Sequence, residues 1–176
     1  SGVQMQSVGE VMSIGRTFRE SLQKAYRSLE VGLDGLESKP VAKGDPDLNR
    51  ASSLDMSTLR YGTAFRLLKV RQAFLEGQSI EDIFNITKID PWFLNQIKML
   101  AESSNNSELL ELKQQGFSDK QIGRIKGKTE IEIRKLRKQQ SILPSFKVVD
   151  TCAAEFEAET PYCYSTYDDE NEIEPL

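Results

Sequence analysis

Apolar residues recur every three or four positions along most of the chain, the spacing that gathers them on one face of an α-helix. The first such stretch begins after Thr17, whose hydroxyl can cap the first turn, with Glu20 completing a capping box. It ends near Gly32. Residues 32–55 are rich in Gly, Pro, Asp, Ser and Asn, so we expect a linker there with at most a short helix.

Six further helices are predicted between residues 63 and 139. Each starts with a capping residue or ends at a glycine, which are the usual helix boundaries. They are expected at about 63–76, after Ser79, after Asp90-Pro91, from Leu109 to Gly116, after Ser118 and after Thr129. The side chains of Trp92 and Phe93 fall on the most apolar of these helices, and we expect them in the core.

These helices form an internal repeat with an offset of 39 residues. Helix-end glycines, caps and apolar positions all coincide: Gly77 with Gly116, Ser79 with Ser118, Asp90 with Thr129, Ile83 with Ile122, Ile86 with Ile125, Trp92 with Ile131, Leu94 with Ile133 and Ile97 with Leu136. We interpret this as two copies of one three-helix unit. Two copies are too few for a solenoid, so the fold class is predicted as all-α, with the two units packed together around a shared core.

The pattern changes after residue 144. Residues 146–149 predict a short β-strand with no partner in this chain, so its sheet is expected to lie elsewhere. The stretch from residue 150 to the end holds nine acidic residues and no basic one, which predicts an extended acidic tail. Within it, Tyr162, Tyr164 and Tyr167 are suited to packing against another surface.

The composition narrows the possible chemistry. The chain has no histidine, which excludes catalytic triads, Cys-His pairs and His-ligated zinc. Gly9 and Gly15 lack the spacing and the Lys-Ser/Thr pair of a phosphate loop. Glu155, Glu157 and Glu159 would share one face of an extended segment, which is more often solvated than catalytic or metal-binding. We therefore predict no catalytic, cofactor-binding or metal-binding residue.

The cellular compartment of the protein and its relation to membranes are predicted from features that the sequence lacks. There is no secretory signal, so Cys152 and Cys163 are expected as reduced thiols in the cytoplasm, although a disulfide between them is the alternative. There is no run of 18 apolar residues, so no membrane partner is expected.

Residues 113–138 carry nine Lys or Arg and three acids, which raises a second functional hypothesis. A basic helix–turn–helix over Ser118–Lys138 would suit nucleic-acid binding. Glu130 and Glu132 oppose it, because they fall in the first turn of the would-be recognition helix, where they would repel phosphate. We favour a basic face that pairs with another part of a larger protein, and expect no nucleic-acid partner.

Several segments resemble the large chain of glutamine-hydrolysing carbamoyl-phosphate synthetase. They are residues 5–18 and 20–25 near the start, 87–94 and 116–119 in the middle, and 149–158, 160–162 and 164–167 near the end. The resemblance implies an internal fragment. Residues 1–34 would be the C-terminal tail of a first ATP-grasp half, and residues 35–57 would be a linker. Residues 58–149 would be the helical oligomerisation (connection) domain. Residues 150–176 would be an extended segment that leads to the second ATP-grasp half and stops before its glycine-rich strand–loop.

The resemblance also implies what the parent protein does. The full enzyme would be a ligase that makes carbamoyl phosphate from bicarbonate, glutamine-derived ammonia and two ATP, with Mg²⁺, for arginine and pyrimidine synthesis. Its partners would be the other ATP-grasp and regulatory domains of the same chain, a glutaminase small chain and further copies of itself. None of the family's nucleotide or metal ligands maps onto this chain, so the fragment alone is expected to be inactive.

Overall fold

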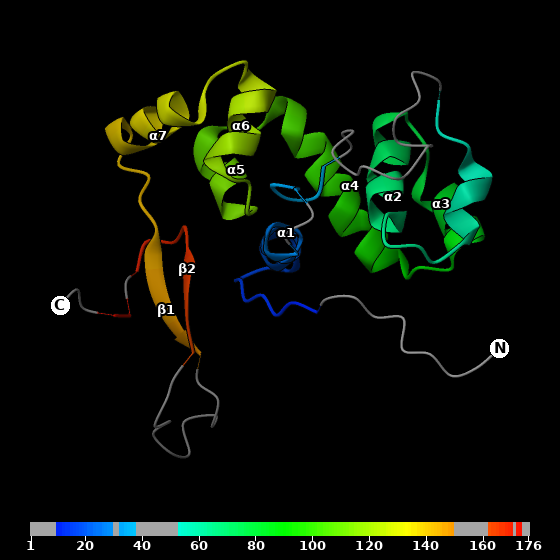
Figure 1. Cartoon of the computed structure of the whole chain (residues 1–176), viewed down its shortest axis with the longest axis horizontal. Coiled ribbons are helices and arrows are strands. Elements are labelled where there is room, and N and C mark those ends of the chain that lie inside the picture. Colours follow the sequence, from blue (N-terminus) through cyan, green and yellow to red (C-terminus); the bar gives the residue numbers. More distant parts are fainter. Residues whose placement is uncertain (1–9, 30–31, 38–52, 150–161, 171, 174–176) are drawn as a thin grey trace.

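The computed structural model describes residues 10–29, 32–37, 53–149, 162–170 and 172–173. Helices make up most of this part of the chain, as predicted (Figure 1). The elements are α1 (Phe18–Ser28), the 3₁₀ helix η1 (Met56–Arg60), α2 (Arg66–Leu75), α3 (Ile80–Thr87), α4 (Pro91–Asn106), α5 (Leu109–Gln114), α6 (Asp119–Lys126), α7 (Glu130–Gln139), β1 (Ser145–Val149) and β2 (Tyr162–Thr166).

The helix starts predicted from capping residues are confirmed. The side chains of Thr17, Ser79, Asp90, Ser118 and Thr129 each accept a hydrogen bond from a first-turn amide. At Ser118 and Thr129 the side chain three positions later bonds back to the cap, completing a capping box. At Thr17 the predicted box is not completed, because the side chain of Glu20 bonds elsewhere.

The offset-39 repeat is present in the backbone. Helices α3 and α6 begin and end at positions 39 apart, and so do the first residues of α4 and α7. The preceding turns also agree, with φ of 87° at Gly77 and 86° at Gly116. The C-caps Lys88 and Gly127 both adopt the left-handed conformation. The two units, α2–α4 and α5–α7, are therefore copies of one local fold.

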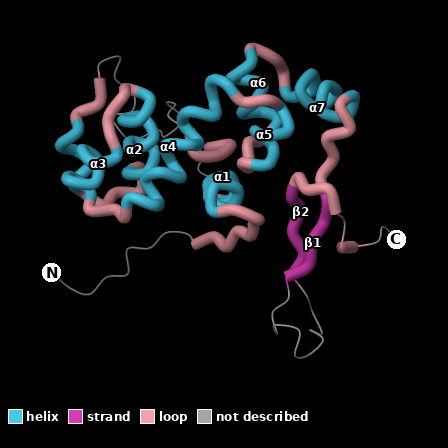
Figure 2. The backbone as a smooth tube through the Cα atoms, turned by 180° about the vertical axis from the view of Figure 1, so that it is seen from behind, coloured by secondary structure: helices cyan, strands magenta, loops and turns pink. Residues whose placement is uncertain are grey.

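The two units share one core. The matched pairs Ile83 with Ile122, and Leu94 with Ile133, are all fully buried in the same apolar cluster. Helix α1 lies beside the long α4, between the two units (Figures 1 and 2), and adds Tyr26 to the cluster. Burial raises the pKa of the Tyr26 hydroxyl to about 12.

The core placement predicted for Trp92 and Phe93 is wrong. Their exposed fractions are 53% and 42%. Helix α4 turns Leu94, Ile97 and Ala101 toward the core at helical spacing, which leaves the two rings on a different face. They pack edge-to-face with each other and with Phe18 of α1, at centroid distances of 4.9, 5.6 and 5.1 Å.

The prediction of a strand without a partner in this chain is also wrong. Strand β1 pairs antiparallel with β2, from Ser145 opposite Thr166 to Val149 opposite Tyr162. Residues 162–166 include two Tyr and one Thr, types that favour strands, whereas the sequence pattern alone predicts only surface packing for the tyrosines. Beyond β2 the acidic segment folds back, because Asp168 and Glu172 each lie 3.5 Å from the buried ammonium of Lys147.

Candidate functional site

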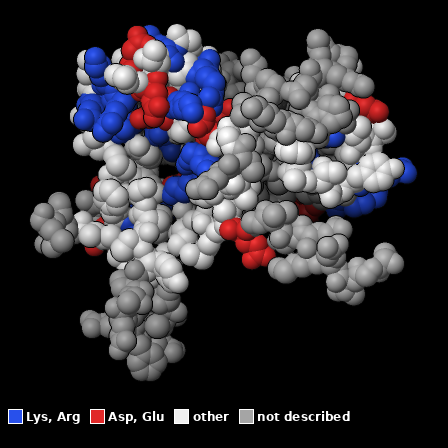
Figure 3. Space-filling view, viewed as in Figure 1, with Lys and Arg blue, Asp and Glu red and all other residues white. Residues whose placement is uncertain are grey.

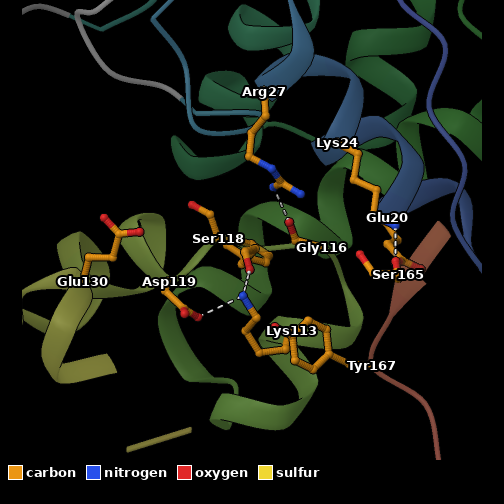
Figure 4. Close-up of a pocket in the computed structure, with 11 residues that line it drawn as sticks. Glu20, Lys24, Arg27, Lys113, Gly116, Ser118, Asp119, Glu130, Ser165 and Tyr167 are labelled. Carbon is orange, nitrogen blue, oxygen red and sulfur yellow. Dashed lines mark hydrogen bonds and ion pairs between the residues drawn. The ribbon is translucent and has the colours of Figure 1, made fainter. Parts of the chain in front are cut away.

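A polar junction joins α1, the second helical unit and the β-hairpin. Its centre is a cavity of about 250 Å³ (Figure 4). Helix α1 contributes Glu20, Lys24 and Arg27, the second unit Lys113, Ser118 and Asp119, and the hairpin side Ser165 and Tyr167. No part of the hydrophobic pattern predicted this junction, because it is assembled mainly from polar and charged residues, and the charged ones lie up to 110 positions apart in the chain.

Glu20 and Lys24 hold together segments from both ends of the described chain. The carboxylate of Glu20, which is 2% exposed, accepts from the backbone N–H of Arg16 at 2.8 Å and from the hydroxyl of Thr166 at 3.0 Å. The ammonium of Lys24 lies 2.8 Å from Glu20 Oε1 and donates to the carbonyls of Ile14 at 2.9 Å and Ser165 at 2.5 Å. One ion pair thus fixes both the segment before α1 and strand β2.

Helix α1 also approaches the second unit closely at Gly116. A Cβ at this position would lie 2.9 Å from Glu20 Cα and 3.0 Å from Gln23 Cβ, so only glycine fits. The buried amide of Gln23 accepts from the backbone N–H of Leu36 at 2.7 Å and from Gln121 Nε2 at 3.2 Å. These bonds connect α1 to residues 32–37 and to α6.

A buried charge cluster supports the hairpin. Asp119 lies 2.9 Å from the ammonium of Lys113 and 3.2 Å from the guanidinium of Arg137. Both cations also face the ring of Tyr167, at 4.9 and 5.6 Å from its centroid. Burial alone would raise the pKa of Asp119, but its bonds to Lys113 and Arg137 hold it below the usual value. Burial lowers the pKa of Lys113.

A second ion-pair group ties α6 to residues 32–37. Asp34 pairs with Arg124 and, at 3.3 Å, with Lys120, while Glu37 lies 2.8 Å from Arg124. Burial opposes ionisation of Asp34, but its bonds to the two cations lower its pKa overall. For Glu37 burial dominates and raises the pKa. Part of the basic stretch is thus paired within this chain, whereas the sequence predicts pairing with another part of a larger protein.

The basic stretch is therefore largely engaged within the chain. Of its nine cations, five bond to protein groups: Lys113, Lys120, Arg124, Lys126 and Arg137. Figure 3 shows acidic side chains interleaved with the basic ones on this part of the surface. The arrangement gives the nucleic-acid hypothesis no support, because such proteins present an uninterrupted basic surface to phosphate.

The remaining residues singled out in the sequence do not converge on this junction. Gly9, Glu155, Glu157, Glu159 and Cys152 lie outside the described residues, so the expectations for them stay predictions. Cys163 lies exposed on β2. In the described part of the chain, no group of three or more His, Cys, Asp and Glu could hold a metal ion. None of the described helices has the length and apolar character needed to cross a membrane.

Comparison with known proteins decides the family. Residues 10–141 match the family model described as "Carbamoyl-phosphate synthetase large chain, oligomerisation domain". The chain belongs to this family. The match runs from the segment before α1 through α7, so it includes the α1 side of the polar junction.

Full-length relatives carry the same name. The chain is 46% identical to the carbamoyl phosphate synthase large chains of Methanothermobacter thermautotrophicus and Pseudomonas aeruginosa, and 44% identical to that of Archaeoglobus fulgidus. These alignments cover 97–98% of this chain but only 16–17% of each relative. The chain therefore spans only about a sixth of the length of these relatives.

Proposed function

We propose that this oligomerisation domain is a non-catalytic connector within a carbamoyl-phosphate synthetase large chain. The single observation that carries the proposal is the polar junction, in which Glu20 and Lys24 bond to the backbone before α1 and to β2 at once. Five of the charged side chains that line the junction, Glu20, Lys24, Arg27, Lys113 and Asp119, are paired with other charged groups or with backbone carbonyls. Such an arrangement fixes geometry and supplies no group poised for acid–base or nucleophilic chemistry.

The parent protein follows from the relatives' names. It would be an ATP-dependent ligase that forms carbamoyl phosphate and uses ATP and Mg²⁺ in domains outside this chain. Residues 1–34 would end a first ATP-grasp half, 35–57 would be a linker, 58–149 the connection domain, and 150–176 would lead to the second half. We propose that its partners are a glutaminase small chain, the regulatory domain and further copies of the large chain. We propose a cytoplasmic location for it.

The catalytic part of the proposal has a direct test. The 176-residue chain is incubated with ATP, bicarbonate and ammonia, and ADP and carbamoyl phosphate are measured against a buffer blank. The Pseudomonas aeruginosa large chain, treated identically, is the positive control. We expect product from the control and none from the domain. Turnover by the domain above the blank would show that it contains a catalytic site.

The connecting role has a structural test in Lys24→Met, which keeps the length of the side chain and removes its charge. Because Lys24 donates to Ser165 and Ile14, we expect faster amide hydrogen exchange in β2 and in residues 10–16, with α2–α4 unchanged. Lys98→Met is the matched control, since among the described residues Lys98 pairs only with the exposed Glu102 on its own helix. Equal exchange in the two variants would contradict the role given to Lys24.

A further inference from the structure

A second, larger cavity adjoins the polar junction and has a different charge. It has a volume of about 450 Å³ and lies between residues 12–14, the C-terminal half of α1 and strand β2. Lys24 and Arg27 are the charged side chains among the described residues that line it, and no described carboxylate does. Hydroxyl groups make up much of the remaining wall, from Ser13, Ser28, Tyr164 and Ser165. The cavity is thus polar, and since Lys24 is paired with Glu20, its positive charge comes from Arg27.

Arg27 has an incomplete set of partners in the part of the chain that is described. Its Nη1 donates to the carbonyls of Gly116 at 2.6 Å and Asp34 at 3.4 Å, and neither Nε nor Nη2 is bonded to a described acceptor. No described carboxylate lies within 4.0 Å of it, whereas Arg124 and Arg137 each pair with one. Burial lowers the pKa of Arg27, and the nearby charges of Asp34 and Glu20 only partly oppose this.

We propose that this cavity is a binding site for a small oxyanion, a phosphate or carboxylate group, with Arg27 as its principal ligand. A guanidinium offers paired N–H donors in one plane, which match two oxygens of such a group. Lys24 contributes neither a free donor nor a net charge, because its ammonium already bonds to Glu20, Ile14 and Ser165. Tyr164 also lines the cavity, and its hydroxyl, which bonds to Arg16, keeps a proton that it can donate.

The smaller cavity at the centre of the junction is not the site. Arg27 and Lys24 also line it, but so do Asp119 and Glu130. Their carboxylates would repel an anion at short range in a partly buried space. The larger cavity offers Arg27 without these acids, so it is the one we assign. This assignment does not depend on the proposed connecting role.

Titration of the ¹⁵N-labelled chain with sodium phosphate, at constant ionic strength, tests the site. We expect saturable shifts of the amide signals of Arg27, Ser28 and Tyr164. The variant Arg27→Gln should bind about tenfold more weakly or worse, because it loses a charged hydrogen bond. Arg134→Gln removes the same charge from the exposed face of α7 and should bind like the wild type.

A parallel titration with sodium acetate distinguishes the sources of the oxyanion. If only phosphate saturates the site, the ligand carries a phosphate group. If only acetate does, the ligand carries a carboxylate. Saturation by both shows that the site recognises either oxyanion. Absence of saturable shifts with either probe in the wild-type chain would overturn the site, as would equal affinities of the Arg27 and Arg134 variants. Circular dichroism shows whether Arg27→Gln is folded. If it is unfolded, the positions of the shifted amide signals in the wild-type chain test the site instead, and shifts confined to residues outside the cavity would overturn the proposal.

Discussion

The two glycines at the equivalent turns of the repeat form a matched pair for mutation. Gly77 and Gly116 have the same backbone conformation, with φ of 87° and 86°. Their surroundings differ. A Cβ at Gly77 would meet nothing within 4 Å, whereas at Gly116 it would lie 2.9 Å from Glu20 Cα and 3.0 Å from both Gln23 Cβ and the carbonyl oxygen of Glu20. Substituting each by alanine therefore separates backbone strain from the packing of α1.

The expected magnitudes follow from these two contributions. An alanine in the left-handed conformation costs about 1–2 kcal/mol, and both variants bear this cost. Overpacking a close contact adds about 1–3 kcal/mol, and only Gly116→Ala bears it, because two of the three opposing atoms belong to the backbone of α1. We expect Gly77→Ala to lose about 1–2 kcal/mol of the free energy of unfolding, and Gly116→Ala about 2–5 kcal/mol.

Equilibrium urea unfolding measures both losses, followed by far-UV circular dichroism and by the fluorescence of Trp92. The indole packs against Phe18, so its emission also reports whether α1 remains docked. For Gly116→Ala we expect the emission in the absence of urea to change, and for Gly77→Ala we expect it to stay as in the wild type. Losses that agree within about 0.5 kcal/mol would refute the close approach of α1 to Gly116.

Three further predictions concern charge and packing. Asp119→Asn should lower the free energy of unfolding by about 3–5 kcal/mol, measured with urea, because it leaves the buried ammonium of Lys113 without its counter-charge. The pKa of Asp119 is lower in the folded chain, so its stabilisation is present above the unfolded pKa and is lost as pH falls through the folded one. The wild-type urea midpoint should thus fall more steeply below about pH 4 than that of Asp119→Asn. Trp92→Ala should lower the free energy of unfolding by about 1 kcal/mol and Leu94→Ala by about 2–5 kcal/mol, because the indole is half exposed and Leu94 is buried. Thermal unfolding measures both losses, and equal decreases of the unfolding temperature would contradict the exposure of the indole.

The helices and their repeat could be predicted because their signals are local. A capping side chain such as Ser118 bonds to an amide three residues away, and a glycine such as Gly116 ends a helix through its own φ. Neither depends on the rest of the fold. The 39-residue offset then required only that such signals recur at equal spacing, which they do to the residue at the ends of α3 and α6.

The features that the sequence predicts wrongly or not at all are contacts between segments that lie far apart in the chain. The partner of β1 begins 13 residues after β1 ends, in a stretch whose tyrosines also suit a surface. The side chains of Trp92 and Phe93 are apolar, but which face of α4 is covered depends on α2 and α1. Glu20 and Asp119 are charged, so the hydrophobic pattern assigns them to solvent, and only their cationic partners make burial tolerable.

Comparison of equivalent positions in the repeat shows which residues of the second unit receive the hairpin. At the positions where the first unit has Phe74 and Ile80, the second has Lys113 and Asp119. An apolar pair is thus replaced by a buried ion pair that faces Tyr167. Such a pair contributes less to stability than an apolar one of similar size, but its directional bonds fix the position of its partners. The second unit therefore exchanges part of its core packing for a defined attachment of the hairpin, which is the contact that the proposed connecting role requires.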